Sequence, residues 1–379
     1  MTAIEVTSPD PSRRRDLNAF IQFPKRLYAA DPLWIAPLDL EQRETLGRKN
    51  PFFEHAHGRL WLAWRNGQVV GRIAAHVDQL YEQTHGEKVG WFGFFECEDQ
   101  AEIAATLLDH AASWLRGQGC TRVRGPFNPS INGCCGLLID GFDTPPYMMM
   151  PHTPPHYPAL VAAAGFEPAQ ELLAYRLDLA DPMPAATRRL VQRFQKRIEL
   201  RSLAEFDRAK GFALMRDIFN DAWQHNWGFV PFTENEFNAM GKELTLVMDS
   251  RQAQLAFLDG RAVGMMATVP DINQAIRGLN GKLLPFGWFH FLKRLKGRGV
   301  NRVRVPLMGV RSELHGTSMA AGVAFCMLAR AWDLSLEKGI VEAEMSWILK
   351  DNKPIRDVIE RIGGKAYKRY HIYEKSLSS

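Results

Sequence analysis

The strand-like segment 341–347, VEAEMSW, carries carboxylates in a place where they could do acid–base chemistry. Side chains alternate between the two faces of a strand, so Glu342, Glu344 and Ser346 share one face and the apolar residues take the other. A carboxylate that faces inward from the middle of a sheet is costly unless it is paired or used. Glu344 is therefore the first candidate for a general base, with an ion pair at the edge of the sheet as the alternative.

A second segment, RSELHGTS at 311–318, has the composition of an anion-binding turn and lies between a predicted strand and a predicted helix. Gly316 allows the backbone to approach a ligand closely, and Thr317 or Ser318 can cap the helix. The free N–H groups and the dipole at a helix start favour phosphate. The corresponding turn in the first half, ECEDQ at 96–100, has no glycine and several carboxylates that would repel phosphate, so we expect the anion site in the second half only.

The elements that must position these residues occur twice. WLAWRNGQVVGRIAAHVD at 61–78 recurs as AFLDGRAVGMMATVPD, and each copy reads as a β-hairpin, closed at Asn66-Gly67 and at Asp259-Gly260. Hairpins followed by strands that alternate with helices predict a mixed sheet, antiparallel at one end and parallel in the middle. The 379 residues are thus predicted to form an α/β protein with two domains, residues 1–180 and 181–379.

This order of elements resembles the GNAT superfamily of acyl-CoA N-acyltransferases. The residues that carry the resemblance are Gly309, Val310, Gly316, Asn352, Gly363 and Tyr373. The segments WFGFFECEDQ, RGPFNPSING and NDAWQHNWGFVPFTENEF are similar to a bacterial tandem-GNAT family with bacterial ceramide synthases among its members. The resemblance implies two tandem GNAT-like domains, each with a mixed central sheet flanked by helices, of which the N-terminal one is degenerate.

The resemblance also implies acyl-CoA as a co-substrate of the C-terminal domain and no metal. GNAT strands splay beside the thioester, and Pro306 in a central strand fits such a splay, although it would equally suit an ordinary edge strand. The expected cofactor-binding residues are Leu307, Met308, Gly309, Val310, Arg311, Gly316, Thr317, Ser318 and Asn352.

Two further residues join Glu344 in the expected catalytic set. Tyr373 follows a Gly-Gly turn and could protonate the departing thiolate, but Tyr175 holds the same place in the first half, so a structural role for Tyr373 is the alternative. His225, in the loop after the first helix of the second domain, could reach an acceptor amine or simply lie at the surface.

An amphipathic pattern at 283–299, LLPFGWFHFLKRLKGRG, bears on the acceptor. Apolar residues at Leu284, Trp288, Phe291, Leu292 and Leu295 form one helical stripe, and the cations that follow are Lys293, Arg294, Lys296 and Arg298. This pattern is typical of a helix in a membrane interface, and a core-packing helix shares the stripe. Trp288 and Phe291, with Trp227 and Asp271, are the expected substrate-binding residues.

Composition narrows the classes of function. The net charge is +5, but aromatic residues do not interleave with the basic clusters, so nucleic acid is not an expected partner. The chain has five cysteines without CxxC spacing, and the sequence shows no apolar leader and no apolar run of ~20 residues. These features predict a cytoplasmic protein, which could also contact the inner surface of the cytoplasmic membrane. The predicted function is transfer of a long-chain acyl group from acyl-CoA to an amine such as a sphingoid base, which would give a ceramide. The alternatives are a small-amine or protein N-acetyltransferase and a non-catalytic ligand-binding protein.

Overall fold

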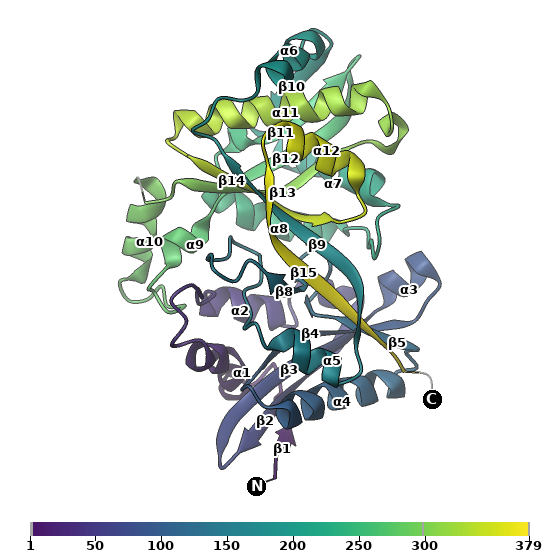
Figure 1. Cartoon of the computed structure of the whole chain (residues 1–379), viewed down its shortest axis with the longest axis vertical. Helices are drawn as coiled ribbons and strands as arrows, with labels where there is room; N and C mark the ends of the chain where they lie inside the picture. Colours follow the sequence, from purple (N-terminus) through teal and green to yellow (C-terminus); the bar gives the residue numbers. More distant parts are fainter. Residues whose placement is uncertain (1–2, 298, 378–379) are drawn as a thin grey trace. The chain divides into compact units, whose positions relative to one another are not determined.

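The computed structural model describes residues 3–297 and 299–377, and they form two compact units. Unit 1 contains residues 1–172, 276–288 and 368–379, and unit 2 contains residues 173–275 and 289–367. The units are therefore not consecutive halves of the chain. Each is an α/β structure, and the helices and strands are labelled in Figure 1.

Unit 1 is built on a mixed sheet. Strands β1 to β4 pair in antiparallel order, β4 and β5 are parallel, and the last part of β15 pairs antiparallel with β5. The elements from the N-terminus to the end of the first repeat are β1 (Glu5–Thr7), α1 (Arg14–Leu27), α2 (Asp39–Leu46), η1 (Pro51–Glu54), β2 (Ala56–Arg65), β3 (Gln68–Asp78), α3 (Gln79–His85), β4 (Val89–Cys97), α4 (Ala101–Gly117), β5 (Arg122–Gly125), β6 (Phe127–Asn128), β7 (Cys134–Cys135), β8 (Leu137–Asp140), α5 (Tyr157–Ala163) and β9 (Glu167–Asp178).

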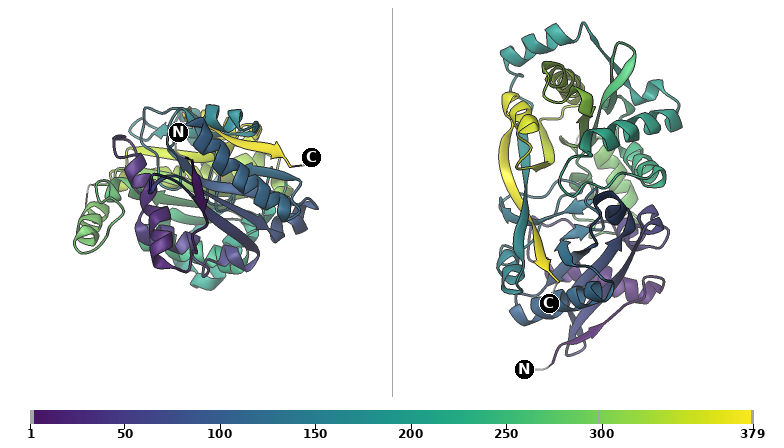
Figure 2. Two further views of the ribbon diagram at one scale, coloured as in Figure 1. Left: turned by 90° about the horizontal axis from the view of Figure 1, so that it is seen from below. Right: turned by 90° about the vertical axis from the view of Figure 1, so that its right-hand side faces the viewer.

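Unit 2 repeats this plan. Strands β10 to β13 pair in antiparallel order and β13 is parallel to β14. In the right view of Figure 2, α7 and α8 lie on one side of these strands and α11 and α12 on the other. The remaining elements of the chain are α6 (Ala185–Phe194), β10 (Ile198–Ser202), η2 (Leu203–Glu205), α7 (Arg208–Trp223), α8 (Glu234–Val247), η3 (Ser250–Gln252), β11 (Ala253–Leu258), β12 (Arg261–Pro270), α9 (Ile272–Ile276), α10 (Gly287–Lys296), β13 (Arg302–Val310), η4 (Ser312–Leu314), α11 (Ser318–Glu337), β14 (Glu342–Leu349), α12 (Lys353–Arg361) and β15 (Lys365–Ser376).

Both predicted hairpins are confirmed. Asn66 and Gly67 close the β2–β3 turn with φ of 53° and 73°, and Asp259 and Gly260 close the β11–β12 turn with φ of 51° and 79°. Positive φ at both central residues matches the right-handed twist of the flanking strands. The two turns therefore fix the register of the antiparallel part of each sheet.

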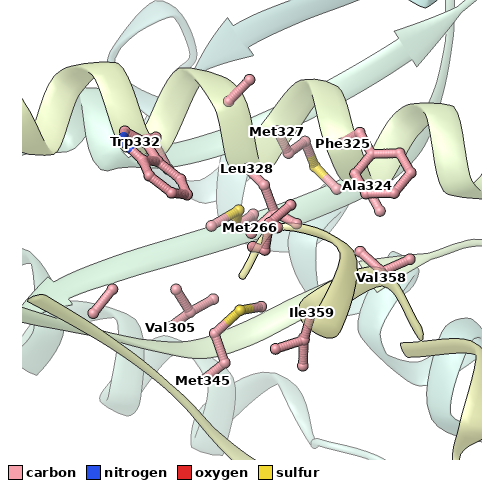
Figure 3. Close-up of a cluster of buried hydrophobic side chains, with 14 of the residues drawn as sticks. Met266, Val305, Ala324, Phe325, Met327, Leu328, Trp332, Met345, Val358 and Ile359 are labelled. Atoms are coloured by element: carbon pink, nitrogen blue, oxygen red, sulfur yellow. The ribbon is translucent and has the colours of Figure 1, made fainter. Parts of the chain in front are cut away.

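Helix α11 forms the centre of the unit 2 core. Met327, Leu328 and Trp332 pack over Val305 and Met345 of the two parallel strands (Figure 3). By length and composition, α11 could cross a membrane. However, 67% of its apolar stretch is buried within the fold. This burial explains its apolar composition as that of a core helix.

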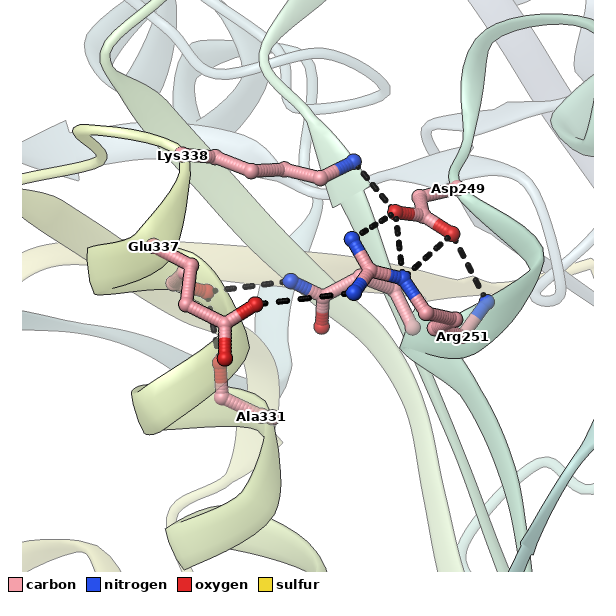
Figure 4. Close-up of polar contacts among 7 residues, drawn as sticks. Asp249, Arg251, Ala331, Glu337 and Lys338 are labelled. Carbon is pink, nitrogen blue, oxygen red and sulfur yellow. Dashed lines mark hydrogen bonds and ion pairs between the residues drawn. The ribbon is translucent and has the colours of Figure 1, made fainter.

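A charged network ties the C-terminal end of α11 to the start of β11. Arg251 and Lys338 both bond the carboxylate of Asp249, at 2.9 and 2.6 Å, and Arg251 also reaches Glu337 at 3.5 Å (Figure 4). Burial opposes ionisation of Asp249, but these hydrogen bonds outweigh it and hold its pKa well below the usual range. The network holds one end of the helix whose other end begins at Ser318.

Candidate active site

Strands β13 and β14 separate beside Pro306. Their parallel pairing runs from Arg302 and Glu342 to Val305 and Met345 and then stops, whereas β13 continues to pair with β12 as far as Val310. Proline has no N–H to donate, so it suits the point at which a ladder ends. The predicted splay is thus present, and residues 307–310 have no strand partner on the side of β14.

The turn after β13 leads into the N-terminus of α11. Thr317 caps the helix by accepting a hydrogen bond from the N–H of Ala320 at 3.2 Å. Among the described residues, the N–H groups of Gly316, Ser318 and Met319 have no acceptor within the protein. Three unpaired amides at the positive end of a 20-residue helix are suited to bind a phosphate.

The charges around this turn are largely balanced within the protein. Arg311, expected to bind the cofactor, donates instead to the carbonyl of Ala262 at 2.9 Å and pairs with Asp217. Glu313 pairs with Arg261 at 2.9 Å. A phosphate at this turn would therefore be held mainly by backbone amides rather than by the Arg311 guanidinium.

Glu344 is fully buried at the point where the two strands separate. The Ser346 hydroxyl donates to its Oε1 at 2.5 Å, and the Tyr367 hydroxyl donates to its Oε2. Arg304, opposite Glu344 in the ladder, lies 3.8 Å from Oε1 and donates to the Ser346 hydroxyl at 2.9 Å. The predicted common face of Glu344 and Ser346 is confirmed, and the carboxylate is held in a defined orientation.

Sequence reasoning missed Arg304 and Tyr367. A signal for Arg304 did exist: the alternating arginines of RVRV at 302–305 face the alternating glutamates of EAEM at 342–345. No comparable signal marked Tyr367, because its contact with Glu344 joins β14 and β15, which are consecutive strands but not neighbours in the sheet. Tyr367 is only half-buried, so its phenol can link the buried carboxylate to the surface of unit 2.

Tyr373 does not lie in this site. It belongs to unit 1, where it pairs with Gly125 of β5 and packs in that unit's core. Burial raises the pKa of Tyr373, as expected for a packed phenol. Tyr175, in unit 2, is also committed to structure, because its hydroxyl donates to Glu360 at 2.8 Å and accepts from Arg356 at 3.0 Å. These surroundings favour a packing role for Tyr373 over the acid role predicted for it.

Two predicted site residues cap helices. Asp271 accepts a hydrogen bond from the N–H of Asn273 at 3.3 Å, just as Asp78 after the first hairpin accepts one from Leu80 at 2.8 Å. Asn352 accepts from the N–H of Ile355 at 3.4 Å at the start of α12. The recurrence of aspartate after each hairpin is therefore explained by capping.

The remaining candidates lie in loops and in α10. His225 is exposed and Trp227 is half-buried, and both lie in the loop between α7 and α8. In α10, Trp288 is exposed and Phe291 is half-buried. Arg298, the last cation of the predicted amphipathic pattern, lies outside the described residues.

Unit 1 has filled the corresponding space between its strands. β4 and β5 pair only from Val89 to Trp91, after which the side chain of Asn128 accepts a hydrogen bond from the N–H of Phe94 at 2.6 Å. The carbonyl of Phe127 lies so close to Gly93 that a Cβ there would come within 1.7 Å of it. The chain itself therefore occupies the position where a pantetheine arm would pair.

No family model matches the chain. It is 41% identical over 365 residues to Protein YghO of Escherichia coli (strain K12), an alignment that covers 96% of this chain and 94% of that protein. It is likewise 41% identical over 365 residues to Bacterial ceramide synthase of Caulobacter vibrioides (strain NA1000 / CB15N), with coverage of 96% and 95%.

Solved structures agree on the fold. A tandem GNAT protein from the clavulanic acid biosynthesis pathway matches with a TM-score of 0.60 at 15% identity, covering 100% of this chain and 99% of that chain. A GCN5-related N-acetyltransferase from Sphaerobacter thermophilus matches with a TM-score of 0.52 at 14% identity, covering 99% and 96%. The chain therefore belongs to the tandem GNAT N-acyltransferase family that includes YghO and the Caulobacter bacterial ceramide synthase.

Proposed function

We propose that this protein transfers an acyl group from acyl-CoA, bound in unit 2, to the amine of a long-chain lipid. The proposed acceptor is a sphingoid base and the product a ceramide-like amide. The observation that carries the proposal is the separation of β13 and β14 between three unpaired amides and a buried carboxylate, Glu344. Acyl transfer from acyl-CoA to an amine is served by this combination: an anchor for the phosphates of CoA, a free strand edge for its pantetheine arm, and a base adjacent to the thioester.

The residues of unit 2 have distinct roles in this proposal. Gly316, Ser318 and Met319 offer their N–H groups to the pyrophosphate. Residues 307–310 of β13 offer an unpaired strand edge to the pantetheine arm. Gly309 has its own reason to be glycine, because a Cβ there would come within 2.3 Å of the Trp223 ring that covers the strand.

Glu344 and Tyr367 handle the proton. The neutral amine nitrogen forms a bond to the thioester carbonyl carbon, the carbon–sulfur bond breaks and releases CoA as its thiolate, and the nitrogen loses one proton as the amide forms. Glu344 accepts that proton through the hydroxyl of Tyr367, which already donates to it. Before the proton is transferred, the Arg304 guanidinium balances the negative charge of the Glu344 carboxylate.

The lipid nature of the acceptor is supported by one relative. The Caulobacter protein, aligned over 96% of this chain, is named a bacterial ceramide synthase, and a ceramide is an amide of a sphingoid base. Fold neighbours below 25% identity carry no information on substrate, so they do not weigh against a long-chain donor.

The test is an assay with paired substrates. Purified protein would receive acyl-CoAs from acetyl to stearoyl, each with a sphingoid base, a small polyamine or a lysine peptide, and the products would be identified by mass spectrometry. We expect amide formation with the sphingoid base and a long-chain donor. Preference for acetyl-CoA with the small amine or the peptide would instead identify an acetyltransferase, and no product with any pair would favour a ligand-binding protein.

A further inference from the structure

Exposed apolar side chains concentrate in one short segment. Leu284 is 78% exposed, Phe286 74%, Phe289 55% and Trp288 49%. Large apolar residues that are this exposed are otherwise scattered singly over the described residues, as at Leu40 and Leu246. A contiguous set on a protein surface indicates contact with an apolar partner.

The fold does not use α10 as a core helix. Every residue of α10 lies in the described part of the chain, and not one of its side chains is buried. Phe291 and Leu295, one turn apart, are half-buried and form its inner side, whereas Trp288, Phe289 and Leu292 are exposed. The apolar stripe is therefore not explained by packing in a core. Phe291, which the sequence pattern grouped with Trp288, lies on the inner face of the helix instead of the exposed one.

The charge around this segment is positive. No aspartate or glutamate occurs between Asp271 and Glu313 in the sequence. Lys282, Lys293 and Lys296 are exposed and, within the residues that the structure describes, form no ion pair. The cores of protein interfaces are depleted in lysine, whereas helices that lie in a membrane interface combine aromatic residues with lysine and arginine.

We propose that residues 284–296, the interfacial segment, dock this protein on the surface of an anionic phospholipid bilayer. The apolar side chains enter the boundary between headgroups and acyl chains, and Lys293 and Lys296 meet the anionic headgroups. The purpose of docking rests on the proposed function: the acceptor amine and the product amide both partition into lipid, and docking would give the protein access to them. It places the protein at the periphery of the cytoplasmic membrane, on the side where thiols stay reduced.

The test is flotation of the full chain with phosphatidylcholine vesicles that do or do not contain phosphatidylglycerol. We expect binding to the anionic vesicles only, and less of it at about 1 M salt, where charges are screened beyond about 3 Å. Lys293→Gln with Lys296→Gln should lower vesicle partitioning roughly thirtyfold, and Phe286→Ser with Phe289→Ser roughly a hundredfold. All four side chains are exposed, so the fold should tolerate both variants.

Matched controls separate this segment from general surface chemistry. Leu246→Ser on α8 removes another apolar side chain, one that is 83% exposed, and Lys210→Gln with Lys242→Gln removes two exposed lysines elsewhere. Both controls should bind vesicles as wild type does. Equal losses in the controls, or no binding by wild type, would overturn the proposal.

Two other outcomes are distinguishable from these. If the wild type ignores vesicles and Phe286→Ser with Phe289→Ser turns a dimer into a monomer in sedimentation, the segment joins two copies and docking is refuted. Acylation of a soluble short-chain analogue of a sphingoid base, in the absence of vesicles, reports on the proposed function alone. Failure of that assay with normal flotation would reject the acyltransferase and leave docking intact.

Discussion

Gly316 offers a direct test of whether the turn before α11 holds the pyrophosphate. Its φ is +77°, and a Cβ placed there would meet no atom within 4 Å, so substitution brings backbone strain without a clash. Asparagine and aspartate tolerate this left-handed conformation better than other residues with side chains. Gly316→Asn and Gly316→Asp therefore have nearly the same shape and strain and differ by one negative charge.

The size of the charge effect follows from exposure. Gly316 is exposed, so a dielectric constant near that of water applies. A carboxylate about 5 Å from each of two phosphate charges is then repelled by about 0.8 kcal/mol per pair. The total of about 1.6 kcal/mol corresponds to roughly a fifteenfold increase in the Kd of CoA for Gly316→Asp relative to Gly316→Asn.

Calorimetric titration with CoA at low salt measures this ratio. At about 1 M salt the two variants should converge, because the Debye length falls to about 3 Å. Equal affinities of the two variants at low salt would show that the pyrophosphate does not bind at this turn. A difference that persists unchanged at high salt would point to a structural effect of the aspartate instead.

Three further predictions concern the proton path, the number of sites and the response to pH. Tyr367→Phe should lower kcat about 10²-fold with an unchanged Kd for CoA, and the double variant Glu344→Gln with Arg304→Gln should lower kcat at least as much. Glu344→Gln alone would also remove the carboxylate beside the buried guanidinium of Arg304, which costs about 3–5 kcal/mol of stability. Titration should give one CoA per chain, and two equal sites would contradict the filled space in unit 1. Burial, helped by the charge of His57, lowers the pKa of His76 to about 3. The buried neutral imidazole therefore makes its full contribution to the free energy of unfolding above the unfolded pKa of ~6.5, and this contribution is lost as the pH falls toward 3. Urea unfolding should show a loss of about 2 kcal/mol between pH 8 and pH 5 from this residue, and His76→Gln should flatten the curve.

Local patterns in the sequence predicted the parts of the fold that depend on local chemistry. Asn66-Gly67 and Asp259-Gly260 determined both hairpins, since positive φ at these residues defines the turn. Alternation in EAEMS at 342–346 placed Glu344 and Ser346 on one face, and Pro306 marked the end of a ladder. In each case a single residue type or a period of two carried the information.

The placement of the last strand was beyond such patterns. Each repeat ends in a similar strand with a tyrosine, Tyr175 or Tyr373, and nothing local distinguishes which sheet each one joins. In the structure Tyr373 pairs with Gly125 in unit 1, whereas Tyr175 lies in the core of unit 2. Tyr367, on the same strand as Tyr373, donates to Glu344, and no local pattern predicted which tyrosine of this strand would contact the carboxylate, because strand partners are chosen by packing across the whole sheet.

The two parallel ladders differ at the rung beside the strand separation, which bears on the proposal that unit 2 alone binds acyl-CoA. In unit 2 this rung pairs Arg304 with Glu344, the carboxylate that is proposed to take up a proton through Tyr367. In unit 1 the last rung pairs Trp91 with Arg124, whose guanidinium is bound by Glu374. An arginine, which stays protonated at all working pH values, cannot accept a proton from an amine. If unit 2 carries the acyl transfer as proposed, the arginine in place of a base, the filled space beside β4 and the carboxylates of the turn at 96–100 are three separate features that would each hinder the same chemistry in unit 1.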